Sequence, residues 1–402
     1  MMKPLPLAGV RILSAEQYGA GPFGSMLLAD LGAEVIKIEN PRDGGDVSRE
    51  SGPFFLGDDP AQPDSQFFQS FNRNKKSLAL DLKHPDGQAV FRRLAATSDA
   101  VMNNLRGDQP ARLGLTHVAL KDVKPSLVCV HLSAYGRDNE RASWPGYDYL
   151  MQAEAGYLHL TGEPDGPPAR MGLSMVDYMT GTTTAMALLA GLLGAARTGI
   201  GRDVDVSLFD VALAQLTYPA TWQLNAGHAI ERMPRSAHPS VVPCQLVKTR
   251  DGWMFVMCMT PKFWDALAHG IGRVDLLDDA RFASPALRRE NRQALSDLLD
   301  AVFGAADTAD WMQRLAGKLP VAPVLDLPQA LANPYVASIG MLQTVPHPAA
   351  PGLRMLANAV KLDGERTPSK VCSALGADTD ALLEQAGFSG AERDRLREQK
   401  VI

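Results

Sequence analysis

Short apolar runs alternate with helix-like segments over the first half of the chain, and this alternation limits the fold more than any other feature. Residues 9–13 and 34–38 are short and rich in β-branched and other apolar side chains, as strands buried in a parallel sheet are. Between them, Pro22 suits the first turn of a helix and Gly32 suits the left-handed position after its last turn. A strand–helix–strand unit of about 30 residues is typical of a parallel βαβ crossover.

The same alternation continues as far as about residue 216. Further strands are expected at residues 78–82, 100–104, 127–132 and 203–208, with helices that begin near Asp86 and at Asp177. The helix 177–198 is rich in small residues and apolar on most faces, which predicts a central position. Repeated β–α alternation predicts an α/β fold with a mainly parallel sheet.

The character of the sequence changes near Asn225. Residues 227–243 are rich in Pro, His, Arg and Ser, and we interpret them as a long functional connection. A smaller α+β unit follows, with a strand at 252–257 and helices at 263–270, 288–303 and 308–315. Prolines between residues 320 and 334 mark a second connection, and residues 379–396 are expected to form a polar helical tail.

Composition and charge exclude several classes of protein. The chain has 402 residues, of which 46% are hydrophobic and 21% charged, as in ordinary globular proteins. The formal net charge of −5 argues against a nucleic-acid partner. The four cysteines lack Cys-x-x-Cys spacing, and the longest apolar stretch, residues 185–196, is shorter than the roughly 20 residues that cross a bilayer. With no signal-peptide pattern, we expect a cytoplasmic protein without a membrane partner.

A glycine motif after the first strand suggests one possible cofactor. Gly19, Gly21 and Gly24 satisfy the G-x-G-x-x-G pattern of dinucleotide-binding sites, and Glu39, 15 residues later, could bind a ribose. However, five residues separate the strand from Gly19, whereas the pattern places its first glycine almost directly after the strand. An NAD-dependent oxidoreductase is therefore a remote alternative. The amides at this helix start could still bind an anion or an acyl group.

Basic and amide side chains stand near the predicted strand ends. Residues 72–76 precede one strand, and Asn104, Leu105 and Arg106 follow another, with Arg112 a turn or two later. Strand ends in open α/β sheets bind ligands, although a solvated basic face explains such residues equally well. The eight histidines never occur in metal-binding spacings, so no metal site is predicted.

Asp177 is the strongest candidate for catalysis. It opens the small-residue helix 177–198 and follows an apolar run, so that a substrate could fit beside it. A carboxylate at a helix N-terminus can simply cap the helix. A partly buried carboxylate that faces a reactive carbonyl can instead act as a nucleophile. The local sequence leaves both roles open.

Several motifs, in the same order and nearly end to end, resemble the class III coenzyme A transferases of the CaiB/BaiF type, the group that contains formyl-CoA transferase. The most diagnostic stretch is LLADLGAEVIKIE, residues 27–39. The other matching motifs are residues 7–13, Ala20-Gly21-Pro22, Gly45-Asp46 with Arg49, Asn74-Lys75 with Ser77, Asp81-Leu82, Gly166-Pro167-Pro168 with Asp177, Thr198-Gly199-x-Gly201 with Val204, Val206 and Leu208, and Lys400-Val401-Ile402.

The resemblance implies a fold, a dimer and a set of CoA contacts. It implies a Rossmann-like large domain built from residues 1–224 and the return segment 331–402, a small domain at 225–330, and a homodimer of interlocked chains. CoA would lie across the large domain as part of the substrate, and no resident cofactor is implied. The implied CoA contacts are Gly19, Ala20, Asn72, Asn74, Lys75, Asn104, Leu105, Arg106, Arg112, Tyr135, Gly136, Arg137 and Asp138. Glu39 then becomes a structural position instead of a ribose ligand.

Asp177 matches the nucleophilic aspartate of the family. The resemblance implies that its carboxylate attacks an acyl-CoA thioester to form a mixed anhydride, which the CoA thiolate converts into an enzyme–CoA thioester. An acceptor acid then takes the CoA in the reverse sequence. An anhydride requires a site that excludes water, and backbone amides of residues 19–21 could hold the developing oxyanion.

The related α-methylacyl-CoA racemases are the main alternative. They carry Gly-His-Asp where this chain has Gly146-Tyr147-Asp148. A phenol, with an ordinary pKa of about 10, is a poor acid–base group near neutral pH. Tyr147 therefore favours a transferase over a racemase.

Two other segments depart from formyl-CoA transferase. The segment 232–239, with Arg235 and His238, resembles family members that act on branched dicarboxylates such as mesaconate, citramalate or itaconate. An arginine there could pair with a distal carboxylate in two hydrogen bonds. Residues 376–379, Gly-Ala-Asp-Thr, replace the usual Gly-Glu-His-Thr of the family, and the sequence offers no interpretation of them.

Overall fold

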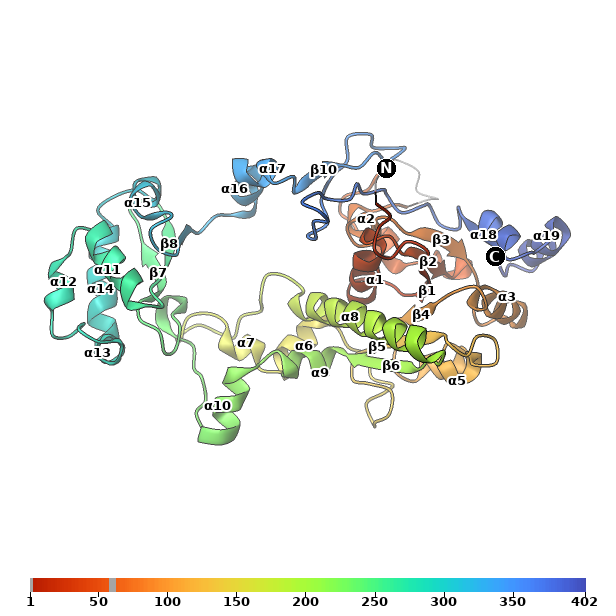
Figure 1. Cartoon of the computed structure of the whole chain (residues 1–402), viewed down its shortest axis with the longest axis horizontal. Coiled ribbons are helices and arrows are strands. Elements are labelled where there is room, and N and C mark those ends of the chain that lie inside the picture. Colours follow the sequence, from red (N-terminus) through yellow and green to blue (C-terminus); the bar gives the residue numbers. More distant parts are fainter. Residues whose placement is uncertain (1–2, 58–62) are drawn as a thin grey trace. The chain divides into compact units, whose positions relative to one another are not determined.

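The computed structural model describes residues 3–57 and 63–402, which form two compact units (Figure 1). The large unit combines Met1–Ala155, Gly172–Leu216 and Pro334–Ile402, so both ends of the chain belong to it. The small unit combines Gly156–Met171 and Thr217–Asn333. The structure thus places Gly156–Met171 in the small unit, where the sequence pattern gave no sign of a break.

A six-stranded parallel sheet forms the centre of the large unit, so the predicted α/β fold is confirmed. Its strands are β1 (Arg11–Ala15), β2 (Glu34–Glu39), β3 (Lys76–Ala79), β4 (Ala100–Asn103), β5 (Val128–Ser133) and β6 (Asp203–Ser207). The strand order β3-β2-β1-β4-β5-β6 reverses between β1 and β4. Ligands of such sheets bind at the carboxyl ends of the strands beside this reversal. The segments that follow β1 and β4 therefore occupy the expected position of a ligand site.

Helices cover both faces of the sheet because successive strand residues point to opposite sides. Leu13 and Val101 belong to the buried cluster that includes Phe91 of α3, whereas Ile12 and Met102 belong to the cluster that includes Leu28 and Leu188. The helices of this part are α1 (Ala20–Asp30), α2 (Gln66–Asn72), α3 (Pro85–Ala95), α4 (Gln109–Arg112), α5 (His117–Leu120), α6 (Asp148–Glu154), α8 (Met175–Thr198) and α9 (Leu208–Ala214), with 3-10 turns η1 (Pro41–Asp43) and η2 (Val47–Glu50).

Helices α1 and α8 pack backbone against backbone through two glycines. A Cβ on Gly24 would lie 2.6 Å from the carbonyl oxygen of Gly181, and a Cβ on Gly181 would lie 2.6 Å from the carbonyl oxygen of Ala20. Neither position tolerates a side chain without a shift of one helix. This contact brings the first turn of α1 close to the first turn of α8, which carries Asp177.

The C-terminal segment returns to the large unit and docks on β3. It contains α17 (Pro334–Ser338), β10 (Leu342–Thr344), β11 (Arg354–Leu356), α18 (Thr379–Gln385) and α19 (Gly390–Glu398). The Ser77 amide donates to the Asp378 carboxylate at 2.8 Å, and the Ala79 amide donates to the Thr379 hydroxyl at 3.0 Å. Residues 376–379, which the sequence left uninterpreted, therefore pair with the edge strand of the sheet.

The small unit has its own core around an antiparallel sheet in the order β7-β8-β9. Its elements are α7 (Tyr157–Leu160), α10 (Tyr218–Ala226), η3 (Pro234–Ser236), β7 (Cys244–Lys248), β8 (Trp253–Met257), α11 (Pro261–Gly270), α12 (Asp275–Asp278), α13 (Pro285–Glu290), α14 (Arg292–Phe303), α15 (Thr308–Leu315), β9 (Val321–Pro323) and α16 (Leu327–Ala332). Phe282, Phe303 and Leu315 are fully buried in this core.

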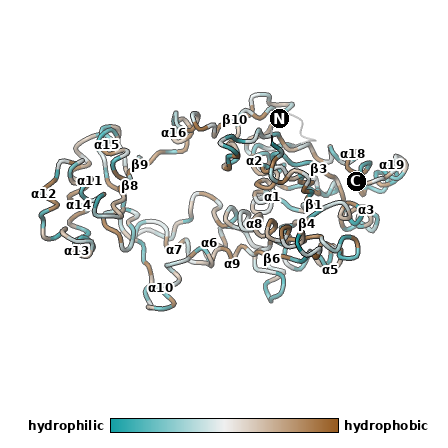
Figure 2. Tube along the Cα trace, viewed as in Figure 1, coloured by the Kyte–Doolittle hydropathy of each residue, from teal (hydrophilic) through white to brown (hydrophobic). Residues whose placement is uncertain are grey.

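Helix α8 is the most apolar long element, and hydrophobic residues gather around it and β4 in Figure 2. By length and composition alone, its 24 residues could cross a membrane, and 39% of its most apolar window is buried inside the structure. Leu188 is fully buried, and a Cβ on Gly191 would lie 2.6 Å from a methyl group of Val128. One side of α8 therefore packs directly on β5.

Candidate active site

A cavity of about 620 Å³ opens in the large unit beside the strand-order reversal. Its wall comes from the segments that follow β1, β4 and β5 and from the first turn of α8. The lining residues are Gln17, Tyr18, Gly19, Ala20, Val47, Asn104, Leu105, Arg106, Gln109, Leu132, Ser133, Ala134, Trp144, Pro145, Gly146, Tyr147, Asp177 and Leu208. The cavity therefore joins the glycine motif, the Asn104 segment and Asp177, which are far apart in the sequence.

Asp177 lies in the first turn of α8 and is 9% exposed. Its backbone amide donates a hydrogen bond of 2.9 Å to the carboxylate of Asp148, which in turn accepts one of 2.6 Å from the side chain of Gln152. Burial, and to a lesser extent the charge of Asp148, raise the pKa of Asp177 to about 7. A carboxylate that is poorly solvated and still titrates near neutral pH is well suited to nucleophilic or acid–base chemistry.

Gly19 lies directly against this carboxylate. A Cβ at position 19 would come within 2.6 Å of Asp177 Oδ2, so any side chain there would displace the carboxylate or the loop. Gly19 also precedes the first turn of α1, whose amides have no acceptor within the helix. The cavity wall thus places the first amides of α1 beside the Asp177 carboxylate.

One arginine lines the cavity, and a second arginine shares its carboxylate partner. Arg106 lines the cavity, and it shares the Asp108 carboxylate with Arg112, at 3.4 Å and 3.3 Å respectively. Their side chains are 50% and 71% exposed, so both remain accessible to an anion. Leu105 adds apolar surface to the same wall of the cavity.

The turn of residues 135–138 packs beside the Asn104 segment. A Cβ on Gly107 would lie 2.1 Å from the carbonyl oxygen of Gly136, so the two backbones touch. The side chains of the turn have other partners: the Tyr135 hydroxyl donates to Glu154 at 2.8 Å, and Arg137 pairs with Asp205. None of residues 135–138 lines the cavity, so any contact of Tyr135, Gly136, Arg137 and Asp138 with CoA would be made outside it.

The segment 72–75 is held inside the large unit. Lys75 is buried, and its ammonium group contacts Glu16, the Pro22 carbonyl and the Asn72 side chain at 2.8 to 2.9 Å. Asn74 donates to Asp30 at 2.7 Å. The sequence placed Asn72, Asn74 and Lys75 among the CoA contacts, whereas the structure gives these side chains internal partners, and we leave them out of the proposed CoA site.

The structure also corrects the dinucleotide interpretation. Glu39 is 2% exposed and accepts two hydrogen bonds from Arg49, at 2.8 Å and 2.7 Å, so it cannot reach a ribose. Gly21 faces Asn104, and Gly24 faces α8. The glycines of the motif are therefore required for close packing around α1.

In the small unit, both candidate substrate residues have internal partners. Arg235 binds Asp300 at 2.5 Å and Asp297 at 3.3 Å, so its charge is already compensated. His238 accepts hydrogen bonds from the amides of Ser240 and Val241 through Nδ1. Burial, with the nearby charge of Arg292, lowers the pKa of His238.

Sequence reasoning missed the role of Asp148 and the cavity wall at Trp144 and Val47. The available signal was the position of Asp148, an acidic residue in the first turn of α6. Nothing in the sequence placed α6 beside Asp177. Among the described residues, no group of three or more His, Cys, Asp or Glu side chains is arranged to hold a metal ion.

A doubly wound parallel sheet with a buried carboxylate beside its strand reversal defines an α/β enzyme with a small-molecule site. The family model described as CoA-transferase family III matches residues 7–379, and the chain belongs to this family. It is accordingly an enzyme, a class III CoA-transferase.

Similar proteins include two CoA-transferases and a solved structure. The succinyl-CoA:glutarate CoA-transferase of Mus musculus is 33% identical over 94% of this chain and 86% of its own length. The succinyl-CoA:mesaconate CoA-transferase of Haloarcula marismortui is 29% identical over 95% of this chain and 96% of its own length. The crystal structure of a CAIB/BAIF family protein from Brucella suis matches with a TM-score of 0.83 and 30% identity, over 96% of this chain and 100% of that one.

Proposed function

We propose that this enzyme moves CoA from an acyl-CoA thioester to a small dicarboxylic acid, with Asp177 as the nucleophile. The observation that carries the proposal is the poorly solvated Asp177 carboxylate in the cavity wall, against Gly19 and the first turn of α1. The dicarboxylate preference is drawn from the relatives named for glutarate and mesaconate.

The proposed reaction passes through three covalent intermediates on Asp177: an anhydride with the donor acid, a thioester with CoA and an anhydride with the acceptor acid. The ionised Asp177 carboxylate attacks the thioester carbonyl and the C–S bond breaks. This releases CoA thiolate and forms a mixed anhydride between Asp177 and the donor acyl group. The thiolate then attacks the aspartyl carbonyl, which releases the donor acid and forms an enzyme–CoA thioester. The acceptor carboxylate attacks this thioester, the C–S bond breaks, and a second mixed anhydride forms as the CoA thiolate is released. The thiolate then attacks the acceptor carbonyl of this anhydride, which yields the new acyl-CoA and frees the Asp177 carboxylate. No proton needs to be transferred in any of these steps.

The surroundings of Asp177 fit the demands of this chemistry. Each attack develops an oxyanion, and the amides at the start of α1 can stabilise it. A cavity lined by Leu132, Trp144 and Leu208 limits the water that would hydrolyse the anhydride. We assign Arg106 and Arg112 to the phosphate groups of CoA because Arg106 lines the cavity, Arg112 shares the Asp108 carboxylate with it, and both side chains stay exposed.

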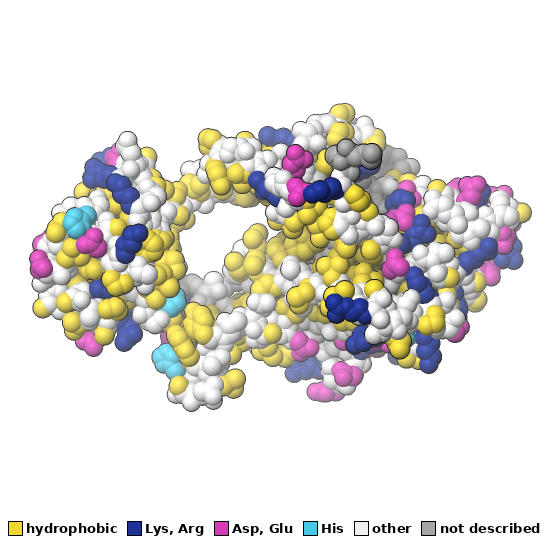
Figure 3. Space-filling view, viewed as in Figure 1, with side chains coloured by type: hydrophobic (Ala, Val, Ile, Leu, Met, Phe, Trp, Pro, Cys, Tyr) yellow, Lys and Arg dark blue, Asp and Glu magenta, His cyan; other side chains and the backbone are white. Residues whose placement is uncertain are grey.

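The remaining expectations concern assembly and location. We propose a homodimer, with the exposed apolar face of α8 inside the interface. Met186 and Leu193 are seven residues apart on α8 and are 64% and 54% exposed, and Ile200, just beyond the end of the helix, is 62% exposed. Figure 3 shows hydrophobic side chains gathered on this part of the large unit. We also propose that the enzyme works in the cytoplasm, as its composition predicts.

Mass spectrometry of acyl-CoA products tests the proposal. The enzyme would receive succinyl-CoA and a pool of small mono- and dicarboxylic acids in deuterated water. We expect a new acyl-CoA from the wild type and none from Asp177→Ala, which should still bind CoA. A parallel reaction would receive a 2-methylacyl-CoA in deuterated water. Uptake of solvent deuterium by this ester, with no new acyl-CoA from either donor, would instead indicate a racemase.

A further inference from the structure

The loop between β1 and α1, residues 16–19, determines where Gly19 lies relative to Asp177. Tyr18 adopts a φ of 70°, in the left-handed region that a residue with a Cβ rarely occupies. Strained backbone of this kind persists only where its surroundings fix it, and such positions are common at functional sites. The contacts that hold this loop therefore bear on the geometry of the active site.

Asn104 holds the loop from the β4 side. Its side-chain oxygen accepts a hydrogen bond of 2.9 Å from the Gln17 amide, and its side-chain nitrogen donates one of 2.7 Å to the Gln17 carbonyl. The amide thus pairs with both backbone groups of one residue, as a neighbouring strand would. Gly21 leaves space for this pairing, because a Cβ there would lie 2.7 Å from the Asn104 Cβ.

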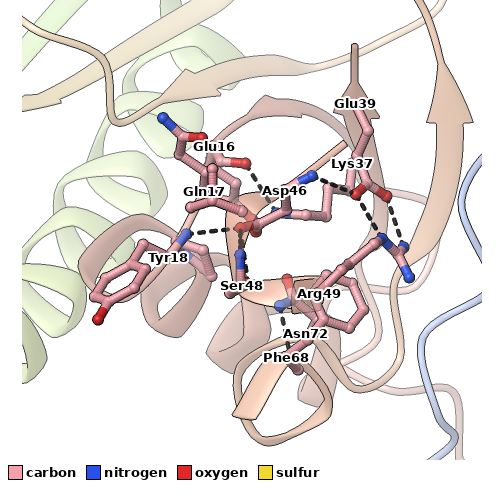
Figure 4. Close-up of polar contacts among 12 residues, drawn as sticks. Glu16, Gln17, Tyr18, Lys37, Glu39, Asp46, Ser48, Arg49, Phe68 and Asn72 are labelled. Atoms are coloured by element: carbon pink, nitrogen blue, oxygen red, sulfur yellow. Dashed lines mark hydrogen bonds and ion pairs between the residues drawn. The ribbon is translucent and has the colours of Figure 1, made fainter. Parts of the chain in front are cut away.

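Asp46 holds the loop from the β2 side (Figure 4). Its Oδ1 accepts a hydrogen bond of 3.1 Å from the Tyr18 amide, and its Oδ2 lies 2.7 Å from the ammonium group of Lys37. Lys37 also donates to the Glu16 carbonyl at 2.9 Å, and the Asp46 amide donates to Glu39 at 3.0 Å. The loop is therefore connected to the end of β2 through buried charges.

These buried charges are mutually compensated. Burial alone would favour the neutral form of Asp46, but the charge of Lys37 and the hydrogen bonds from Lys37 and Ser48 hold the pKa of Asp46 below its usual value. Asp46 is 2% exposed and Lys37 is fully buried. A buried ion pair contributes little net stability, because both charges lose their hydration. It does fix geometry, because separating the pair would leave each charge buried without a partner.

We propose that Asn104 and Asp46 are positioning residues: together they hold the strained loop 16–19 so that Gly19 and the first amides of α1 stay aligned with Asp177 for acyl transfer. This inference rests on the proposed function. Asn104 acts through Gln17, and Asp46 acts through Tyr18, so neither needs to touch the reacting atoms. A misplacement of about 1 Å in an active site can cost about 100-fold in rate, whereas substrate affinity depends on many other contacts.

Steady-state kinetics of Asn104→Ala, Asp46→Ala and Asp46→Asn test this inference, with succinyl-CoA as donor and the best acceptor acid of the product assay. Asp30→Ala is the matched control. Asp30 is 1% exposed and pairs with Arg73 at 2.5 Å, but it lies at the opposite end of α1 from the loop. The free energy of unfolding is measured for every variant, so that lost stability and lost activity are separated.

We expect Asn104→Ala and Asp46→Ala to lower kcat by about 10- to 100-fold and to change the KM for succinyl-CoA by less than about threefold. Asp46→Asn should recover part of the lost kcat, since its amide oxygen can still accept from Tyr18. Asp30→Ala should lose about as much stability as Asp46→Ala but should keep the kcat of the wild type. If Asp46→Ala does not fold, Asn104→Ala decides the question, because Asn104 is only half-buried.

Two results would overturn the inference while the proposed function stands. In the first, Asn104→Ala raises KM at unchanged kcat, so that Asn104 is only a CoA contact. In the second, Asp30→Ala loses as much kcat as Asp46→Ala, so that the effect is general destabilisation. A wild-type enzyme that makes no acyl-CoA from any donor would overturn the proposed function and this inference with it.

Discussion

The backbone amide of Asp177 donates a hydrogen bond of 2.9 Å to the carboxylate of Asp148, although 29 residues separate the two in the chain. Asp148 therefore caps the first turn of α8 and also places a negative charge near the proposed nucleophile. The charge adds to burial in raising the pKa of Asp177 to about 7. One residue thus helps to fix the position of the proposed nucleophile and contributes to its raised pKa.

This pKa predicts how activity depends on pH. Only the ionised carboxylate attacks the thioester, so kcat should rise about tenfold per pH unit below 7 and level off above it. Asp148→Asn removes the neighbouring charge but leaves the burial, so the midpoint should move to lower pH without reaching the ordinary value for aspartate. Measurements of kcat from pH 5 to 9 check both statements, and identical midpoints in the two enzymes would contradict them.

The same ionisation predicts an effect on stability. The folded pKa of about 7 lies above the ordinary 3.8, so the free energy of unfolding should fall as the pH rises through this window. Asp177→Asn removes this cost and should be more stable than the wild type above pH 7, by at most about 4 kcal/mol. The difference should vanish near pH 4. Denaturant unfolding at pH 4 and 8 measures this difference, and Asp310→Asn, which changes an exposed aspartate and keeps Asp177, is the control.

Gly19 should not tolerate even one added methyl group. In Gly19→Ala the new Cβ would meet Asp177 Oδ2 at 2.6 Å, so the carboxylate or the loop must move. We expect kcat to fall by about 100-fold or more. Gly352→Ala is the control, because no atom lies within 4 Å of its new Cβ. If Gly19→Ala is as active as Gly352→Ala, the close approach of Gly19 to the Asp177 carboxylate is not needed for activity.

Arg106 and Arg112 should affect the binding of CoA esters. Arg106→Ala and Arg112→Ala should each raise the KM for acyl-CoA by about three- to tenfold, since exposed charged contacts contribute about 1 kcal/mol each. Their kcat should change little, and higher salt should reduce the effect. Arg395→Ala, an exposed arginine on α19, serves as the control. A large fall in kcat with unchanged KM would contradict the assignment.

The sequence predicted those elements that depend on local patterns. Alternating apolar and helical segments led to the α/β fold, and the predicted helix 308–315 coincides with α15. Local patterns were less reliable where one residue interrupts a helix. The expected tail 379–396 is two helices, because Gly387 takes a φ of 81° between them, and the expected helix 288–303 breaks at Asn291. Such breaks depend on packing that a periodic pattern does not record.

The sequence by itself determined the order of the strands along the chain, the family resemblance and the choice of Asp177 as candidate nucleophile. Only the tertiary structure decided which distant groups meet there: Gly19, Asp148 and the half-buried Asn104. It also showed that Lys75 is buried against Glu16 instead of facing a ligand. The physical reason is that periodicity and motifs report short-range preferences, whereas burial, pKa and hydrogen-bond pairing arise from the contacts that folding creates.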